Sequence, residues 1–236
     1  MARTVGFFNP ECPYTITNAE LQSESPSISY QRAQALDCNG DEANAVMYGG
    51  RKTQTFTFRG TGTGNFGTIS VGSIAGTEKF HMDSVAVSYS TTDNPELTIS
   101  AHAHTSGDSH GSPHNTATPS LTLPATFGTC AWNTFFSLTA DKSVSSFSYN
   151  LSLTHEEANG CDGNATASQN RDAVETVTVE FVGIVAQSDV EPAFEGGWTV
   201  TSANPGTKGN TAAETSSYTL EHHIAINGGS SASSES

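Results

Sequence analysis

The feature that most constrains the fold of this chain is an alternation of apolar and polar residues with a period of two. Segment 146–155 reads SFSYNLSLTH and places Phe147, Tyr149, Leu151 and Leu153 on one side. This period is typical of a β-strand with one buried face, because successive side chains of a strand point to opposite faces. The same pattern recurs at 53–60, 83–90, 96–102, 120–125, 175–185, 197–203 and 217–226.

The segments between these stretches carry turn residues rather than helical patterns. Connectors such as TGTGNFG, TTDNP and SANPGTKGN are rich in Gly, Pro, Asn and Asp, which suit tight turns. Only 29–37 (SYQRAQALD) and 41–48 (DEANAVMY) fit a helical turn or two. With charged residues at only 14%, the chain is predicted to be an all-β protein, a β-sandwich or small β-barrel with long polar loops.

Two stretches of the chain match each other at a constant offset, which predicts an internal duplication. The expected units are 1–120, with a histidine-containing loop, and 121–228, followed by a disordered Ser-rich tail at 229–236; a single domain is the alternative. If the duplication is real, 29–37 is a strand equivalent to 148–156. The coinciding pairs are Cys38/Cys161, Gly40/Gly163, Thr53/Thr176, Thr55/Thr178, Phe58/Phe181 and Gly60/Gly183.

The net charge of −15, from 24 acids and 9 bases, argues against a nucleic-acid-binding protein, because binding to phosphates requires clustered Lys and Arg. No run of apolar residues is long enough to cross a membrane. The N-terminal MARTVGFFNPECPYT lacks the apolar core of a secretory signal. Synthesis in a cytoplasm without a signal peptide is therefore expected, with the widely spaced cysteines as free thiols.

The stretch AHAHTSGDSHGSPH at 101–114 holds four of the eight histidines. His102 and His104 share one face of a strand, and His110 or His114 could complete a three-histidine metal site of the kind that catalytic zinc prefers. The alternative is a polar loop with exposed histidines, favoured because a Gly/Ser/Pro-rich loop gives poor support to a metal site. No bound metal or cofactor is therefore expected, and these four histidines are candidates only.

Other local motifs are better explained as structure than as chemistry. Segment 37–42 (DCNGDE) begins like a calcium loop, but Glu42 stands at position 6, where Gly is needed, and Tyr48 at position 12, where Glu is needed, so a β-turn is predicted. Segment 155–157 (HEE) is not the zinc motif HExxH. The aromatic residues Trp132, Phe135, Phe136 and Trp198 could stack on a sugar, but the strand-like alternation around them predicts packing in the core or at an interface. No catalytic set emerges, so a non-enzymatic protein is expected.

Segment 139–183 (TADKSVSSFSYNLSLTHEEANGCDGNATASQNRDAVETVTVEFVG), with 27–60 as a related unit, resembles virion structural proteins of tailed bacteriophages, most closely major tail tube proteins. The resemblance lies in a strand, a polar loop with a Gly turn, and a second long strand. It implies a subunit of the virion whose partners are its own copies, in stacked rings, and other virion proteins. A duplicated subunit would let trimers imitate hexamers.

A tail tube carries DNA through its lumen, and the acidity of the chain agrees with that role. An acidic wall repels DNA over about 8 Å at physiological salt, so DNA passes as cargo and is not bound. Glu175 and Glu180, at presumed solvent-facing strand positions, are candidate lumen residues. The alternatives are another virion component (capsid decoration protein, tail terminator or fibre segment) and a sugar- or metal-binding β-sandwich.

Overall fold

The structure is a computed structural model. It describes residues 12–36, 38, 42–104, 115–126, 128–159, 165–190, 194, 196–206, 214–224 and 226. Within them, strands dominate. The elements in chain order are β1 (Ala19–Leu36), β2 (Glu42–Gly60), β3 (Ile74–Ala75), β4 (Phe80–Ser90), β5 (Glu96–His104), α1 (Thr129–Phe135), β6 (Ser143–Asn159), β7 (Ala165–Val182), α2 (Gln187–Val190), β8 (Thr199–Asn204) and β9 (Thr215–Ile224).

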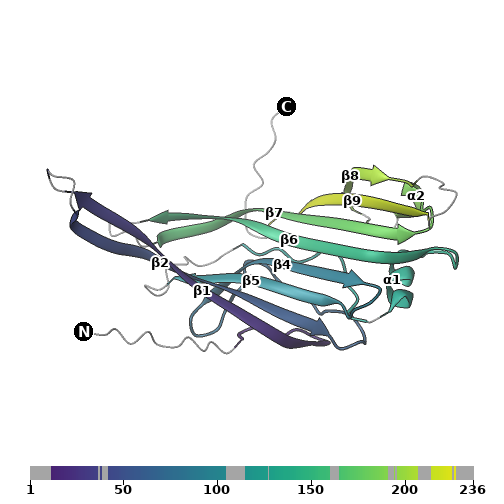
Figure 1. Ribbon diagram of the computed structural model, residues 1–236, viewed down its shortest axis with the longest axis horizontal. Helices are drawn as coiled ribbons and strands as arrows, with labels where there is room; N and C mark the ends of the chain where they lie inside the picture. The colour runs from purple at the N-terminus through teal and green to yellow at the C-terminus, as the bar shows by residue number, and fades with distance from the viewer. Residues whose placement is uncertain are drawn as a thin grey trace.

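All of these strands belong to one sheet. Their order is β1-β2-β5-β4-β6-β7-β9-β8, with β3 attached to β4 (Figure 1), and every pairing is antiparallel. The sheet is open, with β1 and β8 at its two edges. The predicted all-β class is confirmed, in a sandwich-like form rather than as a closed barrel.

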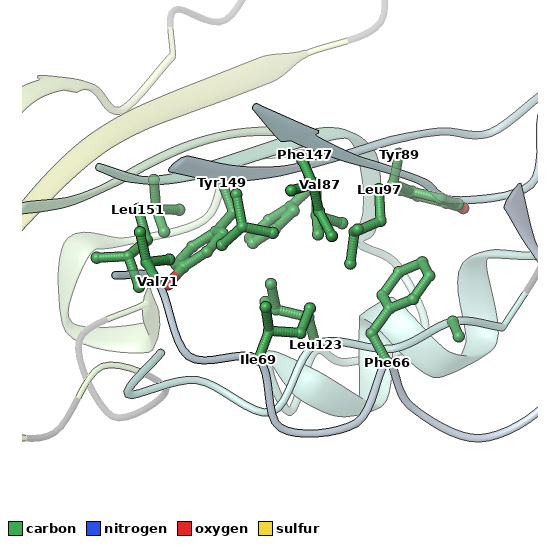
Figure 2. Close-up of a cluster of buried hydrophobic side chains, with 14 of the residues drawn as sticks. Phe66, Ile69, Val71, Val87, Tyr89, Leu97, Leu123, Phe147, Tyr149 and Leu151 are labelled. Carbon is green, nitrogen blue, oxygen red and sulfur yellow. The ribbon is translucent and has the colours of Figure 1, made fainter. Parts of the chain in front are cut away.

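The main core lies between one face of the sheet and the irregular segments 61–73 and 115–126. Figure 2 shows Ile69 and Leu123 from these segments facing Val87 and Tyr149 of the sheet. The two segments are held together by backbone hydrogen bonds, such as the one from the Phe66 amide to the Leu123 carbonyl at 3.0 Å. They therefore act as the second layer of the sandwich.

Two long β-hairpins, β1–β2 and β6–β7, extend beyond the shared sheet. Pairing of β2 with β5 stops at Arg51, whereas β1 and β2 remain paired as far as Leu36 and Glu42. Likewise β6 pairs with β4 only over 146–152, while its pairing with β7 continues to Asn159. Both hairpin ends project from the same end of the molecule, away from α1 and α2 (Figure 1). We call these extensions the β1–β2 arm and the β6–β7 arm.

The arms bear on the predicted duplication. Thr53 and Thr176, like the buried pair Phe58 and Phe181, lie in the second strand of their respective hairpins. The sheet is continuous through the pairing of β4 with β6, across the expected boundary at residue 120. The duplication and the division into 1–120 and 121–228 stay predictions. Cys161, most of 37–42 and the tail 229–236 lie outside the described residues.

Three local predictions were wrong. Residues 29–36 and 42–48 are strand rather than helical turns, as the duplication predicted for 29–37, because the backbones of β1 and β2 pair from Ala19 to Leu36 and from Glu42 to Gly60. Segment 129–135 is helical, which the spacing of Trp132, Phe135 and Phe136 at i, i+3 and i+4 could have indicated. Segment 120–125 forms no strand, because the Ser120 amide donates to the Glu175 side chain instead of to a β-ladder.

Candidate metal centre

Four histidines converge where β5, β4 and β6 run side by side. His81 on β4 pairs directly with His102 on β5. The His155 ring, from β6, lies 4.3 Å from the His81 ring and 5.0 Å from the His102 ring, measured between centroids. The side chains of His81 and His102 are 0% exposed, and those of His104 and His155 are 6% exposed. The cluster is therefore almost completely withdrawn from solvent.

A β-bulge orients the β4 side of this cluster. The register with β5 shifts between Met82 and Ser84, which leaves Asp83 as the extra residue. Phe80 and Met82 enter the hydrophobic core, so His81 between them points to the opposite side of the strand. The bulge thus places the carboxylate of Asp83 next to the His81 and His102 rings.

Asp83 accepts hydrogen bonds from two of the imidazoles. Its Oδ1 lies 3.0 Å from Nδ1 of His81 and 2.7 Å from Nδ1 of His102. Burial raises the pKa of Asp83, but the hydrogen bonds from His102 and His81 outweigh burial and hold that pKa well below its ordinary value. Asp83 is therefore an anion that receives the Nδ1–H of both rings.

Glu157 lies at the other side of the cluster. Its Oε1 is 3.2 Å from Nε2 of His102, 2.9 Å from Nε2 of His104 and 3.2 Å from Nε2 of His155. The hydrogen bonds from these three rings hold the pKa of Glu157 far below its ordinary value. One carboxylate oxygen is thus the point on which three Nε2 atoms converge.

The pKa values of the two fully buried rings, His81 and His102, shift in opposite directions. Burial lowers the pKa of His81 despite its hydrogen bond to Asp83. Burial also disfavours the charged form of His102, but hydrogen bonds to Asp83 and Glu157 outweigh it and raise the pKa of that ring. His102 is distinguished by having a carboxylate at each of its nitrogens.

Asn170 of β7 fixes the orientation of the His155 ring. Its Oδ1 accepts a hydrogen bond from Nδ1 of His155 at 2.7 Å, and its Nδ2 donates to the Asn115 carbonyl at 2.6 Å. Gly72 allows this contact, because a Cβ there would lie 2.6 Å from the Asn115 oxygen and 2.8 Å from Asn170 Nδ2. The φ of +89° at Gly72 also favours glycine.

The sequence predicted only part of this cluster. His102 and His104 are members, whereas His110 and His114 lie outside the described residues. His81, His155, Asp83 and Glu157 were missed. The available signal was three i, i+2 pairs of ligand-type residues, His81/Asp83, His102/His104 and His155/Glu157, each at one end of a predicted strand segment.

Two overlapping sets of three ligand atoms are each close enough to share a metal ion, with His102 common to both. One atom each from His81, His102 and His155 lie within 4.8 Å of one another, and so do one atom each from His102, His104 and Glu157. Imidazole nitrogens with a carboxylate oxygen are the ligands of zinc and related transition metals.

A second buried polar cluster surrounds Glu175 and corrects the expectation that this residue lines a lumen. Glu175 is 0% exposed. Its carboxylate accepts hydrogen bonds from the Ser120 amide at 2.7 Å, the Ser120 hydroxyl at 2.6 Å, the Tyr149 hydroxyl at 2.6 Å and His222 Nδ1 at 2.8 Å. Glu175 is therefore a structural anchor between the loop 115–126 and the sheet. Glu180, in contrast, is exposed.

The aromatic residues pack in the interior, as the preferred interpretation of the sequence held, although Trp132 does so from a helix. Trp132 is 0% exposed and stacks on Tyr89 with ring centroids 4.7 Å apart. Trp198 is half-buried and lies over the His222 ring at 5.2 Å. They do not form an exposed sugar platform.

Comparisons with known proteins identify no relative. No model of a known protein family matches the chain, and a search of curated proteins finds no significant match. Among the described residues, neither helix has the length and apolar character needed to cross a membrane.

Proposed function

We propose that this protein is a non-catalytic structural subunit that assembles with copies of itself, in the manner of a tail tube protein of a bacteriophage particle. The observation that carries the proposal is the edge strand β1. It is 18 residues long and pairs with β2 alone among the described strands. A long edge strand presents unpaired backbone groups, which are a template for pairing with another chain.

The side chains of β1 add to this argument. Leu21, Ile28 and Tyr30 are 38%, 45% and 52% exposed, and all three lie on this strand. Ile28 and Tyr30, two residues apart on one face of the strand, are large apolar side chains exposed at a sheet edge, which is typical of a surface that another protein covers. A second copy of the chain is the partner we infer, because homo-oligomers account for most soluble assemblies.

The two arms supply a second means of contact. Beyond Arg51 in the β1–β2 arm and beyond Leu153 in the β6–β7 arm, no further strand is paired with the two-stranded ribbon among the described residues. An isolated two-stranded ribbon is marginally stable in water. Arms that project together from one end of the subunit (Figure 1) would gain stability by lying against the next subunit in a stack.

The resemblance of 139–183 and 27–60 to tail tube proteins gives the assembly its proposed form, stacked rings around a lumen. The charge of −15 supports passage of DNA without binding, and Glu180, on the exposed side of β7, remains a candidate lumen residue. In this role the protein would reside in the virion and contact other virion proteins. Another virion component would share the edge-strand contact but would not form a regular tube.

The test is electron microscopy and sedimentation velocity of the purified full-length chain over a range of concentrations. We expect rings or tubes of constant diameter. The double variant Ile28→Lys/Tyr30→Lys, which places charges on the exposed face of β1, should remain folded but sediment as a smaller species. Thr91→Lys, in the exposed turn after β4, is the matched control and should assemble normally.

Persistence of monomers of the wild-type chain at every concentration would refute the proposal. Normal assembly of the Ile28→Lys/Tyr30→Lys variant would show instead that β1 is not the contact. Closed rings that never stack would favour a tail terminator or decoration protein over a tube.

A further inference from the structure

We propose that His81, His102, His155 and Glu157 bind a single zinc ion, which ties the base of the β6–β7 arm to β4 and β5. This inference is independent of self-assembly, because all four ligands come from one chain. The ion would have a structural role, since three nitrogens and one oxygen complete a tetrahedral shell and leave no open position.

The distances between ligand atoms fit such a shell. Two ligands bound to a tetrahedral zinc ion at about 2.0–2.1 Å are about 3.3–3.4 Å from each other. Glu157 Oε1 lies 3.2 Å from Nε2 of His102 and 3.2 Å from Nε2 of His155. The ring of His81 lies against both of these histidines, with centroids 5.0 Å and 4.3 Å away. Small side-chain movements would therefore suffice to surround an ion.

The hydrogen bonds of the rings also favour a metal. His102 faces Asp83 with Nδ1 and Glu157 with Nε2, and His155 faces Asn170 with Nδ1 and Glu157 with Nε2. A neutral imidazole carries only one N–H, so a neutral ring cannot donate to both of the oxygens that it faces. With an ion, each ring donates Nδ1–H and its Nε2 lone pair binds the metal. Neither ring then has to carry a charge inside the cluster.

The residues hydrogen-bonded to the Nδ1 atoms of the rings are of the kind that a metal site requires. Metal-binding histidines almost always donate their other N–H to a carboxylate, amide or carbonyl oxygen, which fixes the tautomer and the ring orientation. Asp83 serves His81 and His102 in this way, and the Asn170 side chain serves His155. All three ligand rings thus have an oriented Nδ1, which leaves Nε2 as the ligand atom.

The position of the site gives the ion its role. His155 and Glu157 lie on the part of β6 that pairs with β7 alone, at the start of the β6–β7 arm. His81 and His102 lie on β4 and β5, within the shared sheet. An ion bound to all four would fix the direction in which the arm leaves the sheet. His104, whose Nε2 lies 2.9 Å from Glu157 Oε1, would hold the carboxylate in place.

The test uses the full-length chain, stripped of metal with EDTA and titrated with Zn²⁺ in a calorimeter. We expect one ion per chain and a rise in melting temperature of about 5–10 °C at free zinc 100-fold above Kd. Mg²⁺ should have no effect, because it prefers oxygen ligands. X-ray absorption of the wild-type zinc protein should give three nitrogens and one oxygen at about 2.0–2.1 Å.

His155→Gln should weaken zinc binding more than 100-fold, beyond the about 10–100-fold that loss of an outer-shell partner costs. Its melting temperature in EDTA shows whether it still folds. The controls are His223→Gln, at an exposed position of β9, and the double variant His110→Gln/His114→Gln. Both controls should bind zinc as the wild type does.

Three results would overturn the proposal: no zinc uptake by the wild type, six-coordinate oxygen-rich absorption spectra, or loss of binding in the His110→Gln/His114→Gln variant while a folded His155→Gln variant still binds. The first would show that the four rings form a hydrogen-bonded cluster only. The third result would place the ion at His110 and His114 instead.

Discussion

Replacement of Glu175 by alanine gives the sharpest test of how the sheet binds the irregular segment 115–126 that covers its core. The carboxylate is completely buried and accepts four hydrogen bonds from three residues. One of them comes from the Ser120 amide of the irregular loop, and another from Tyr149 in the core. Glu175→Ala would leave all of these donors without their acceptor.

The magnitude follows from the chemistry of the donors. A hydrogen bond to a charged group contributes about 1.5–3 kcal/mol, and a buried donor left unsatisfied costs about 1–3 kcal/mol. Removal of one partner from a buried ionic group costs about 3–5 kcal/mol in total, because the individual contributions are not additive. We expect Glu175→Ala to lower the free energy of unfolding by about 4–5 kcal/mol.

Glu175→Gln separates charge from shape. The amide oxygen can accept from the Ser120 N–H and the Tyr149 hydroxyl, while the amide nitrogen can donate to the Ser120 hydroxyl. His222 must then take the tautomer that accepts at Nδ1. We expect a loss of only about 1–2 kcal/mol. Glu180→Ala, five positions along the same strand and exposed, is the control and should change stability by less than about 0.5 kcal/mol.

The assay is urea unfolding in EDTA, followed by the fluorescence of Trp132 and Trp198. With an m-value of about 2–3 kcal/mol/M, the midpoint for Glu175→Ala should fall by about 1.5–2 M. A Glu175→Ala midpoint that matches the Glu180→Ala midpoint would refute the reasoning. A Glu175→Gln loss equal to that of Glu175→Ala would show that charge, rather than hydrogen-bond geometry, holds the loop.

Three further predictions follow from individual residues. Gly72→Ala should lower stability by about 2–4 kcal/mol in a melting experiment and also weaken zinc binding, because its Cβ would push on Asn170. Trp132→Ala should cost about 3–5 kcal/mol in urea unfolding, because it leaves a cavity in the core and removes the stacking on Tyr89. Burial, and then the charge of Glu175, raise the pKa of Tyr149 in the folded protein. Above about pH 10 the unfolded chain therefore loses a proton that the folded protein keeps. The free energy of unfolding then falls with rising pH. This alkaline loss of stability should be smaller in Tyr149→Phe.

Local patterns in the sequence predicted the strands well where one face of a strand is buried. Segment 146–155 and segment 96–102 are strands, because their alternation matches a surface with one dry side. The helix at 129–135 was missed although Trp132 and Phe136 have helical spacing, because the flanking alternation favoured a strand. The loop 120–125 was missed because its backbone bonds to a side chain from β7, which lies far away in the sequence.

The candidate metal centre shows where prediction from the sequence stops. The pair His102 and His104 was visible, because two residues on one strand face need no knowledge of the fold. His104 and Glu157, 53 residues apart, meet only because β5, β4 and β6 are neighbours in the sheet. The bulge at Asp83, which places its carboxylate beside the His81 and His102 rings, depends on the register between β4 and β5.

By itself, the sequence determined that the protein is all-β, that Trp132 and Phe136 pack inside, and that it is strongly acidic, since these properties depend on local periodicity and composition. The tertiary structure alone decided which strands are neighbours, that Glu175 is buried and Glu180 is exposed, and that four histidines share one site. The physical reason is that strand order and register are set by contacts between residues distant in sequence, which local alternation does not specify.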